Sequence, residues 1–220
     1  MSYQIKIPSY TCGGEGCIEN VPAIIEKEHA KKIMVFTDKG IRSTGLLDGL
    51  TKILDETAAE YKIFDDLTPE PAYQDVERVM DEAAQYEGDF IIAIGGGSVM
   101  DAAKLCSVLK GASYTVKDLL KDPAIAEKQI KTLMIPTTCG TGSEATCNAI
   151  VAIPEEQSKK GIVNDNMIPD YVFLDSQMIR KLPKAIIAAT GVDALAHVVE
   201  CFTSKKQHHF LTAMQWQVQN

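Results

Sequence analysis

A short, fully apolar run followed at once by a glycine triplet limits what this chain can fold into. Phe90 to Ile94 is apolar at every position, and a strand that is apolar on both faces belongs inside a sheet covered on both sides. Gly95-Gly96-Gly97-Ser98 comes next, and apolar residues at helical spacing extend from Val99 to Leu109. A strand, a glycine turn and a helix in this order are typical of a parallel α/β sheet.

The same alternation of strands and helices continues on both sides of this segment. Ile33–Thr37, Tyr61–Phe64 and Thr132–Pro136 are short apolar runs that predict buried strands. Leu46–Glu60 and Tyr73–Tyr86 place apolar residues at the spacing of helices that cover a sheet. We therefore predict a Rossmann-like parallel sheet with right-handed crossovers.

The pattern changes beyond about residue 149, where shorter strands joined by polar turns are expected. These strands are Ile150–Ile153, Gly161–Val163 and Tyr171–Leu174. After Pro183 the chain becomes helical. We predict a dinucleotide-binding α/β domain at residues 1–181, followed by the start of an all-helical, metal-binding domain at residues 182–220.

Composition narrows the class of protein. The chain has 220 residues with 22 Lys and Arg against 30 Asp and Glu, a net charge of -8, and an acidic surface argues against general nucleic-acid binding. No apolar run approaches the length of a membrane span, and the N-terminus lacks the apolar core of a signal peptide. The six cysteines form no CxxC pair. We expect a cytoplasmic protein with reduced thiols and no membrane partner.

Two features predict a dinucleotide site. The glycine triplet lets the backbone approach a ligand, the helix N-terminus offers N–H groups to a pyrophosphate, and Ser98 can cap the helix or donate to a phosphate. A tight turn without a ligand is the alternative. Asp38 ends the first strand, where a carboxylate can bind a ribose diol and repel a 2′-phosphate, which favours NAD over NADP. A plain turn aspartate is the alternative there.

Two further motifs carry polar chemistry. A hydroxyl-rich loop at residues 136–144 follows the fourth strand, at the edge of the sheet where ligands of α/β folds collect; a flexible polar loop is the alternative. Asp193 and His197 are four residues apart and therefore share a helix face. A carboxylate with an imidazole suits a divalent transition metal, whereas a helical Asp–His hydrogen bond is the simpler explanation of the pair alone.

Together these segments resemble the iron-containing alcohol dehydrogenase family. The matching motifs, in order, are GGGSxxDxAK at 95–104, TTCGTGSE at 137–144 and GxDAxxH at 191–197. The resemblance runs from about Ile7 to Lys206. It implies a Rossmann-like domain followed by an all-helical domain, a dehydroquinate synthase-like architecture, with the active site in the cleft between them.

The resemblance also implies roles for individual residues. The cofactor contacts it implies are Gly96, Gly97 and Ser98 at the pyrophosphate, Thr137, Thr138 and Thr141 along the cofactor, and Lys160 near its ribose. Asp193 and His197 would be the first two ligands of a divalent metal, iron or else zinc, which would bind the alcohol oxygen and lower its pKa. Hydride would then pass between substrate and nicotinamide. Glu70 stands where the family often has Asn, which affects a contact expected near the adenine.

The end of the chain departs from the family. The family takes two more metal-binding histidines from a longer chain, and residues 207–220 do not resemble the family after Lys206. We hypothesise a frameshift at the preceding lysine pair, which would make these residues an out-of-frame tail. A helix over Gly191–Phe202 would then expose apolar residues, so we expect a homo-oligomer, formed either by this face or by the N-terminal strand segment.

The predicted function is NAD-dependent, metal-dependent interconversion of a small alcohol and its aldehyde or ketone, impaired in this chain. One alternative is a dinucleotide-binding module without catalysis. The other is a glycerol-dehydrogenase-like or dehydroquinate-synthase-like enzyme. The uninterrupted TTCGTGSE loop and GVDALAH favour the alcohol dehydrogenase branch.

Overall fold

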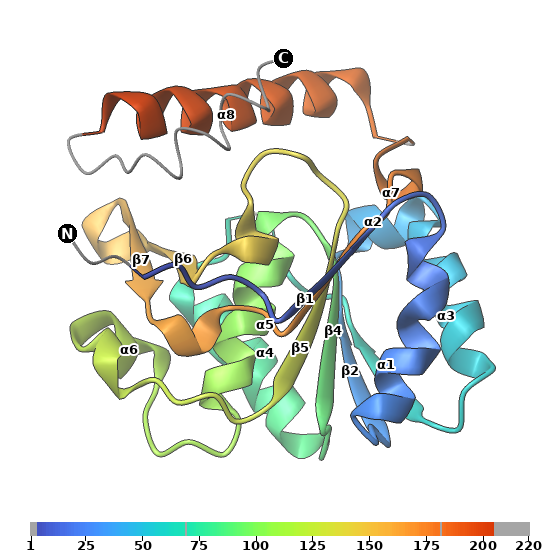
Figure 1. Cartoon of the computed structure of the whole chain (residues 1–220). Coiled ribbons are helices and arrows are strands. Elements are labelled where there is room, and N and C mark those ends of the chain that lie inside the picture. The colour runs from blue at the N-terminus through green and yellow to red at the C-terminus, as the bar shows by residue number, and fades with distance from the viewer. Residues whose placement is uncertain (1–3, 69, 181, 205–220) are drawn as a thin grey trace.

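A six-stranded parallel sheet forms the centre of the structure, a computed structural model that describes residues 4–68, 70–180 and 182–204 (Figure 1). The strand order is β1-β8-β5-β4-β2-β3, and each pairing is parallel. The strands are β1 (Tyr10–Gly13), β2 (Lys32–Phe36), β3 (Glu60–Phe64), β4 (Phe90–Gly95), β5 (Lys131–Pro136) and β8 (Tyr171–Leu174). The predicted Rossmann-like parallel sheet is confirmed.

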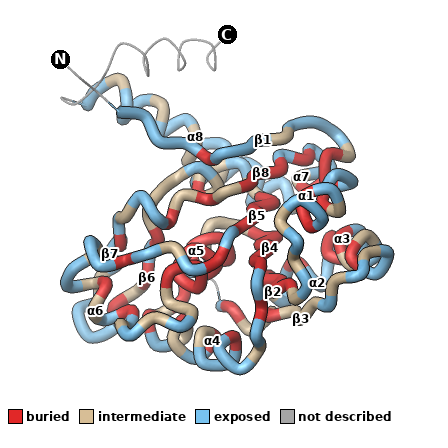
Figure 2. Tube along the Cα trace, turned by 60° about the horizontal axis from the view of Figure 1, so that its bottom comes forward, coloured by how far each residue is buried: buried red, intermediate tan, exposed pale blue. Residues whose placement is uncertain are grey.

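Helices cover both faces of this sheet (Figure 1). On one face lie α1 (Val21–Lys27), α2 (Lys39–Ser43) and α3 (Leu46–Asp55), and on the other lie α4 (Tyr73–Gln85) and α5 (Gly97–Leu109). Figure 2 shows that burial is concentrated in the central strands and in α5. The two covered faces explain why the central strands are apolar at every position.

Strand β4 shows how this pattern arises. All six of its residues are buried. Phe90, Ile92 and Ile94 pack into the core beneath α1 and α3, whereas Ile91 and Ala93 pack beneath α4 and α5. Alternate side chains of a strand point to opposite faces, so both sets must be apolar.

The second group of strands divides between two sheets. β6 (Asn148–Ile153) and β7 (Ser158–Val163) form a separate antiparallel hairpin. β8, which the sequence pattern grouped with them, instead returns to the main sheet between β1 and β5. The hairpin buries Ala149 and Val151 in a third apolar cluster beside α5 and α6 (Val116–Lys121).

Two helix boundaries differ from the sequence prediction. The helix expected to reach Glu60 ends at Asp55, because Glu60 begins β3 and pairs with Lys32 of β2. The last described helix, α8 (Lys184–Thr203), begins seven residues before Gly191, the start of the helix expected to expose apolar residues, but directly after Pro183, where the sequence predicts that the chain becomes helical; it follows the short α7 (Gln177–Arg180). Residues 207–220, the hypothesised out-of-frame tail, lie outside the described residues.

Helix α8 lies across the edge of the sheet at which the parallel strands end, above the loop that follows β5 (Figure 1). None of its residues is buried, and Val192, Leu195 and Val199 are 66%, 56% and 48% exposed. Within the described residues, α8 is the one helix that is both long enough and apolar enough to cross a membrane. Its mean hydropathy is 1.6. The sequence expectation concerned an uninterrupted apolar run, whereas α8 carries Asp193, His197 and Glu200 among its apolar residues.

Candidate cofactor site

The glycine turn joins β4 to α5 as the sequence predicts. Gly96 is extended at φ -82° and ψ -173°, and its carbonyl accepts hydrogen bonds from the N–H groups of Val99 and Met100. Within the described residues, no side chain caps the start of α5. The first amides of the helix therefore point toward the C-terminal edge of the sheet, where they can bind an anion.

Gly97 also allows the loop after β5 to approach the turn closely. A Cβ at this position would lie 2.9 Å from Cγ2 and 3.0 Å from Oγ1 of Thr141. A larger residue would push this loop away from the N-terminus of α5. Packing alone therefore requires a glycine at this position.

Two cavities meet at the turn and share Gly97 and Ser98. The first, here called the α2 cavity, lies beside the start of α2, and its lining includes Asp38, Thr137 and Thr138. The second, here called the hairpin cavity, lies beside β6 and β7, and its lining includes Glu70, Asp101, Thr141, Ile150, Ala152 and Lys159. A ligand that follows both cavities must cross the N-terminus of α5.

Asp38 is a turn residue that also lies at a cavity. Its carboxylate caps α2, with Oδ1 accepting a hydrogen bond from the Ile41 N–H at 2.8 Å. The residue is half-buried and lines the α2 cavity. It is thus a turn aspartate that also presents a carboxylate to a ligand-sized space.

The predicted threonines lie on both sides of the turn. Thr137 is fully buried in the lining of the α2 cavity, and its hydroxyl has no hydrogen-bond partner among the described residues. Thr138 lines the same cavity, whereas Thr141 lines the hairpin cavity. A buried hydroxyl without a partner beside a cavity fits a polar ligand there, because buried polar groups are otherwise nearly always paired.

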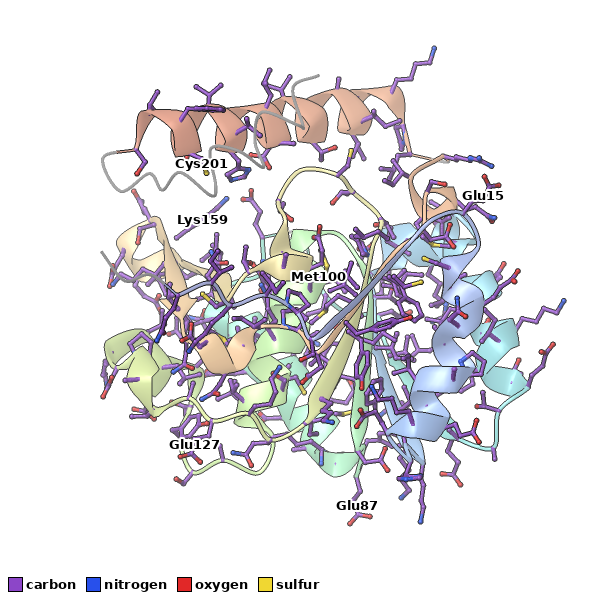
Figure 3. All side chains as sticks on the ribbon, in the orientation of Figure 1. Glu15, Glu87, Met100, Glu127, Lys159 and Cys201 are labelled. Carbon is purple, nitrogen blue, oxygen red and sulfur yellow. The ribbon has the colours of Figure 1, made fainter. Side chains whose placement is uncertain are left out.

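The register of the hairpin places Lys159 at the hairpin cavity and Lys160 on the opposite face. Lys160 pairs with Val151 in the ladder, so it lies on the face away from the cavity, and its ammonium is 2.7 Å from the carboxylate of Glu156. Lys159 pairs with Ala152 and lines the hairpin cavity with it. Figure 3 shows Lys159 on the side of the hairpin that lies beneath α8. The structure therefore brings Lys159, and not Lys160, together with the other site residues.

Glu70 lies at the hairpin cavity. Its N–H donates to Ser98 Oγ at 3.2 Å, and its carboxylate is 2.6 Å from the ammonium of Lys159. Both contacts belong to the hairpin cavity, on the opposite side of the glycine turn from Asp38.

A buried ion pair within α5 was missed by the sequence reasoning. The Lys104 side chain is fully buried, and its ammonium lies 3.0 Å from Asp101 Oδ1. The ammonium also donates to the carbonyls of Ser143 and Asn148, while Asp101 accepts from the Ser143 hydroxyl and from the Ile150 N–H. Burial lowers the pKa of Lys104, and the carboxylate of Asp101 opposes that shift. The signal for this pair was the DxAK segment of the first motif.

Asp193 and His197 lie on one face of α8, as their spacing requires. Their Oδ1 and Nδ1 atoms are 3.9 Å apart, and both side chains are about half exposed. Within the part of the chain that the structure describes, no group of three His, Cys, Asp or Glu side chains is placed to hold a metal ion. Two ligands are too few for a stable metal centre, so these residues alone do not fit a complete site.

Comparison with known proteins identifies the family. A model of the iron-containing alcohol dehydrogenases matches residues 8–176, which include the glycine turn, the lining of the hairpin cavity and β8. The chain belongs to the iron-containing alcohol dehydrogenase family.

Individual relatives of this dehydrogenase family agree in sequence and fold. The chain is 32% identical over 204 residues to long-chain-alcohol dehydrogenase 1 of Geobacillus thermodenitrificans, covering 91% of this chain and 51% of the relative. A solved iron-containing alcohol dehydrogenase from Thermotoga maritima superposes with a TM-score of 0.88 at 33% identity, over 97% of this chain and 59% of that one. Sulfoacetaldehyde reductase from Bifidobacterium kashiwanohense, solved in complex with NAD+, gives 0.85 at 28%, over 93% and 54%. The chain thus spans about half the length of the curated relatives it matches.

Proposed function

We propose that this chain binds NAD across the glycine turn, with one nucleoside half in each of the two cavities. The observation that carries the proposal is that both cavities share Gly97 and Ser98 at the N-terminus of α5. The pyrophosphate would lie on these residues, where free amides and the helix dipole favour an anion. Asp38 would bind the adenosine ribose in the α2 cavity, which leaves the hairpin cavity for the nicotinamide half.

The remaining residues would orient the dinucleotide. The Thr137 hydroxyl, which has no partner among the described residues, offers a hydrogen bond inside the α2 cavity, with Thr138 beside it. Thr141 and Lys159 line the hairpin cavity, so Lys159 takes the ribose contact first predicted for Lys160. Bound NAD would supply hydride transfer, which is the chemistry of the cofactor itself.

For the whole protein we propose NAD- and metal-dependent interconversion of a small alcohol with its aldehyde or ketone. Family membership supports the reaction class, and Asp193 with His197 would contribute two ligands to iron or zinc. Because the described residues bring together only this pair, we propose that the 220-residue chain binds the dinucleotide with little turnover.

The exposed surface of helix α8 suits association with another protein chain. Its exposed apolar residues favour self-association, and we propose a homo-oligomer formed through this surface. Asp193 and His197 lie in its middle, where a membrane would disfavour them, so we propose a protein partner for it and not a lipid one. All six cysteines are free thiols in the described residues, which suits a cytoplasmic protein.

Titration with NADH, followed by its fluorescence, tests the proposal. We expect saturable binding. Asp38→Ser should weaken NADH binding and reduce the difference in affinity between NADH and NADPH. Lys121→Met, an exposed change on α6, is the control and should leave both affinities unchanged. Absence of NADH binding by the folded chain would refute the cofactor site. Substantial dehydrogenase turnover after addition of iron or zinc would refute the proposal of little turnover.

A further inference from the structure

Glu70 has an unusual backbone conformation at the edge of the hairpin cavity. Its φ is +53°, in the left-handed region that a residue with a side chain rarely adopts. Neighbouring contacts hold it there, because its N–H donates to Ser98 Oγ and the Pro71 carbonyl accepts from the Ala152 N–H at 3.0 Å. The segment before α4 is thus fixed both to the glycine turn and to the hairpin.

The Glu70 side chain extends this connection across the cavity. Its Oε1 atom lies 2.6 Å from the Lys159 Nζ, and the two side chains are 69% and 51% exposed. Glu70 comes from the segment before α4 and Lys159 from β7, and both line the cavity that contains Ser98. The ion pair therefore joins two walls of the space at its solvent side.

We propose that Glu70 sets the affinity for the dinucleotide by holding Lys159 in this ion pair. The inference rests on the proposed function, in which the nicotinamide half enters the hairpin cavity. Entry requires the Lys159 ammonium to exchange the carboxylate for the ligand. The ion pair thus competes with the ligand. The free energy needed to break the pair makes ligand binding less favourable by the same amount.

The size of the effect follows from the exposure of the pair. Exposed ion pairs contribute little, and a pair of this kind corresponds to a change in affinity of up to about fivefold. Glu70→Gln keeps the length and hydrogen-bonding capacity of the side chain but removes its charge. We expect this variant to bind NADH about threefold to fivefold more tightly than the unmodified chain.

A comparison of ligands and variants tests the inference. ADP ends at the pyrophosphate on Gly97 and Ser98 and has no nicotinamide half to enter the rest of the hairpin cavity, so Glu70→Gln should change the ADP affinity less than the NADH affinity. In a Lys159→Met background, Glu70→Gln should no longer tighten NADH binding. In a Lys160→Met background the gain should persist, because Lys160 pairs with Glu156 on the opposite face of the hairpin.

The outcomes distinguish a failure of the role of Glu70 from a failure of the proposed dinucleotide binding. If no folded variant binds either NADH or ADP, the proposed function fails. If NADH binds but Glu70→Gln has no effect, changes ADP equally, or acts without Lys159, the role of Glu70 is overturned. Urea unfolding of each variant establishes that the compared proteins are folded. Because the Glu70 side chain is 69% exposed, we expect its substitution to leave the fold intact.

Discussion

Replacing Lys104 by methionine should destabilise the protein strongly, although the substitution lies inside a regular helix. The Lys104 side chain is fully buried, and its ammonium is 3.0 Å from both Asp101 Oδ1 and the Ser143 carbonyl. Methionine fills a similar volume but donates no hydrogen bond. The variant would leave the Asp101 carboxylate, whose side chain is 12% exposed, without its cation.

The expected magnitude is large on the scale of the whole fold. Removing one member of a buried ion pair costs about 3–5 kcal/mol, and a domain is stable by roughly 5–15 kcal/mol in total. With a urea dependence of about 2 kcal/mol per molar, the midpoint of unfolding should fall by about 1.5–2.5 M. The effect should reach beyond α5, because the same ammonium binds the Asn148 carbonyl at the start of the hairpin.

Urea unfolding followed by circular dichroism measures this loss. The matched control is Lys121→Met, since that side chain is 79% exposed and should shift stability by no more than about 0.5 kcal/mol. Adding Asp101→Asn to Lys104→Met should cost less than the sum of the two single changes, because no charge is then left buried. A midpoint for Lys104→Met equal to that of the control would refute the reasoning, as would additive single and double variants.

Three further results are expected. Gly140→Ala would place a Cβ 2.7 Å from the Thr190 carbonyl and so displace α8 from the loop after β5. Proteolysis between α7 and α8 should then become faster, while the midpoint of urea unfolding stays the same. An unchanged cleavage rate would contradict this contact. Burial and a hydrogen bond to a glutamate raise the pKa of Tyr171 to about 12. The folded state therefore keeps a proton that the unfolded chain loses near pH 10. The free energy of unfolding should fall between pH 10 and 12, and it should fall less steeply in Tyr171→Phe. If the two proteins lose stability identically over this pH range, the linkage to Tyr171 is excluded. Val192→Ser with Leu195→Ser should reduce self-association in sedimentation, and an unchanged distribution would exclude this part of α8 as the contact surface.

Local pattern was sufficient for the centre of the fold. The apolar run of β4 requires cover on both faces, and the glycine triplet directly after it places a helix N-terminus at the edge of the sheet. Asp38 follows β2, so the parallel sheet brings it to the same edge. These inferences depend on neighbours in the sequence and on the geometry common to parallel sheets.

Other features depend on contacts that local pattern does not contain. Only the register of the hairpin decides which of Lys159 and Lys160 faces the cavity, because a shift of one residue reverses the face of every side chain. The burial of Lys104 was missed because a lysine in a helix is usually exposed, and its partners lie in a later loop. The place of β8 was missed because it pairs with β1 and β5, which are distant in the sequence.

That pairing has a consequence for how the chain acquires its structure during synthesis. β1 lies at an edge of the sheet, and its registered neighbour is β8, with Tyr10 opposite Tyr171. The first strand to leave the ribosome must therefore wait for the last strand of the sheet, while β2, β3, β4 and β5 can already assemble. Such distant pairing slows folding and leaves strand edges exposed to other chains in the interval. The period before β8 emerges is when the nascent chain most needs protection from aggregation.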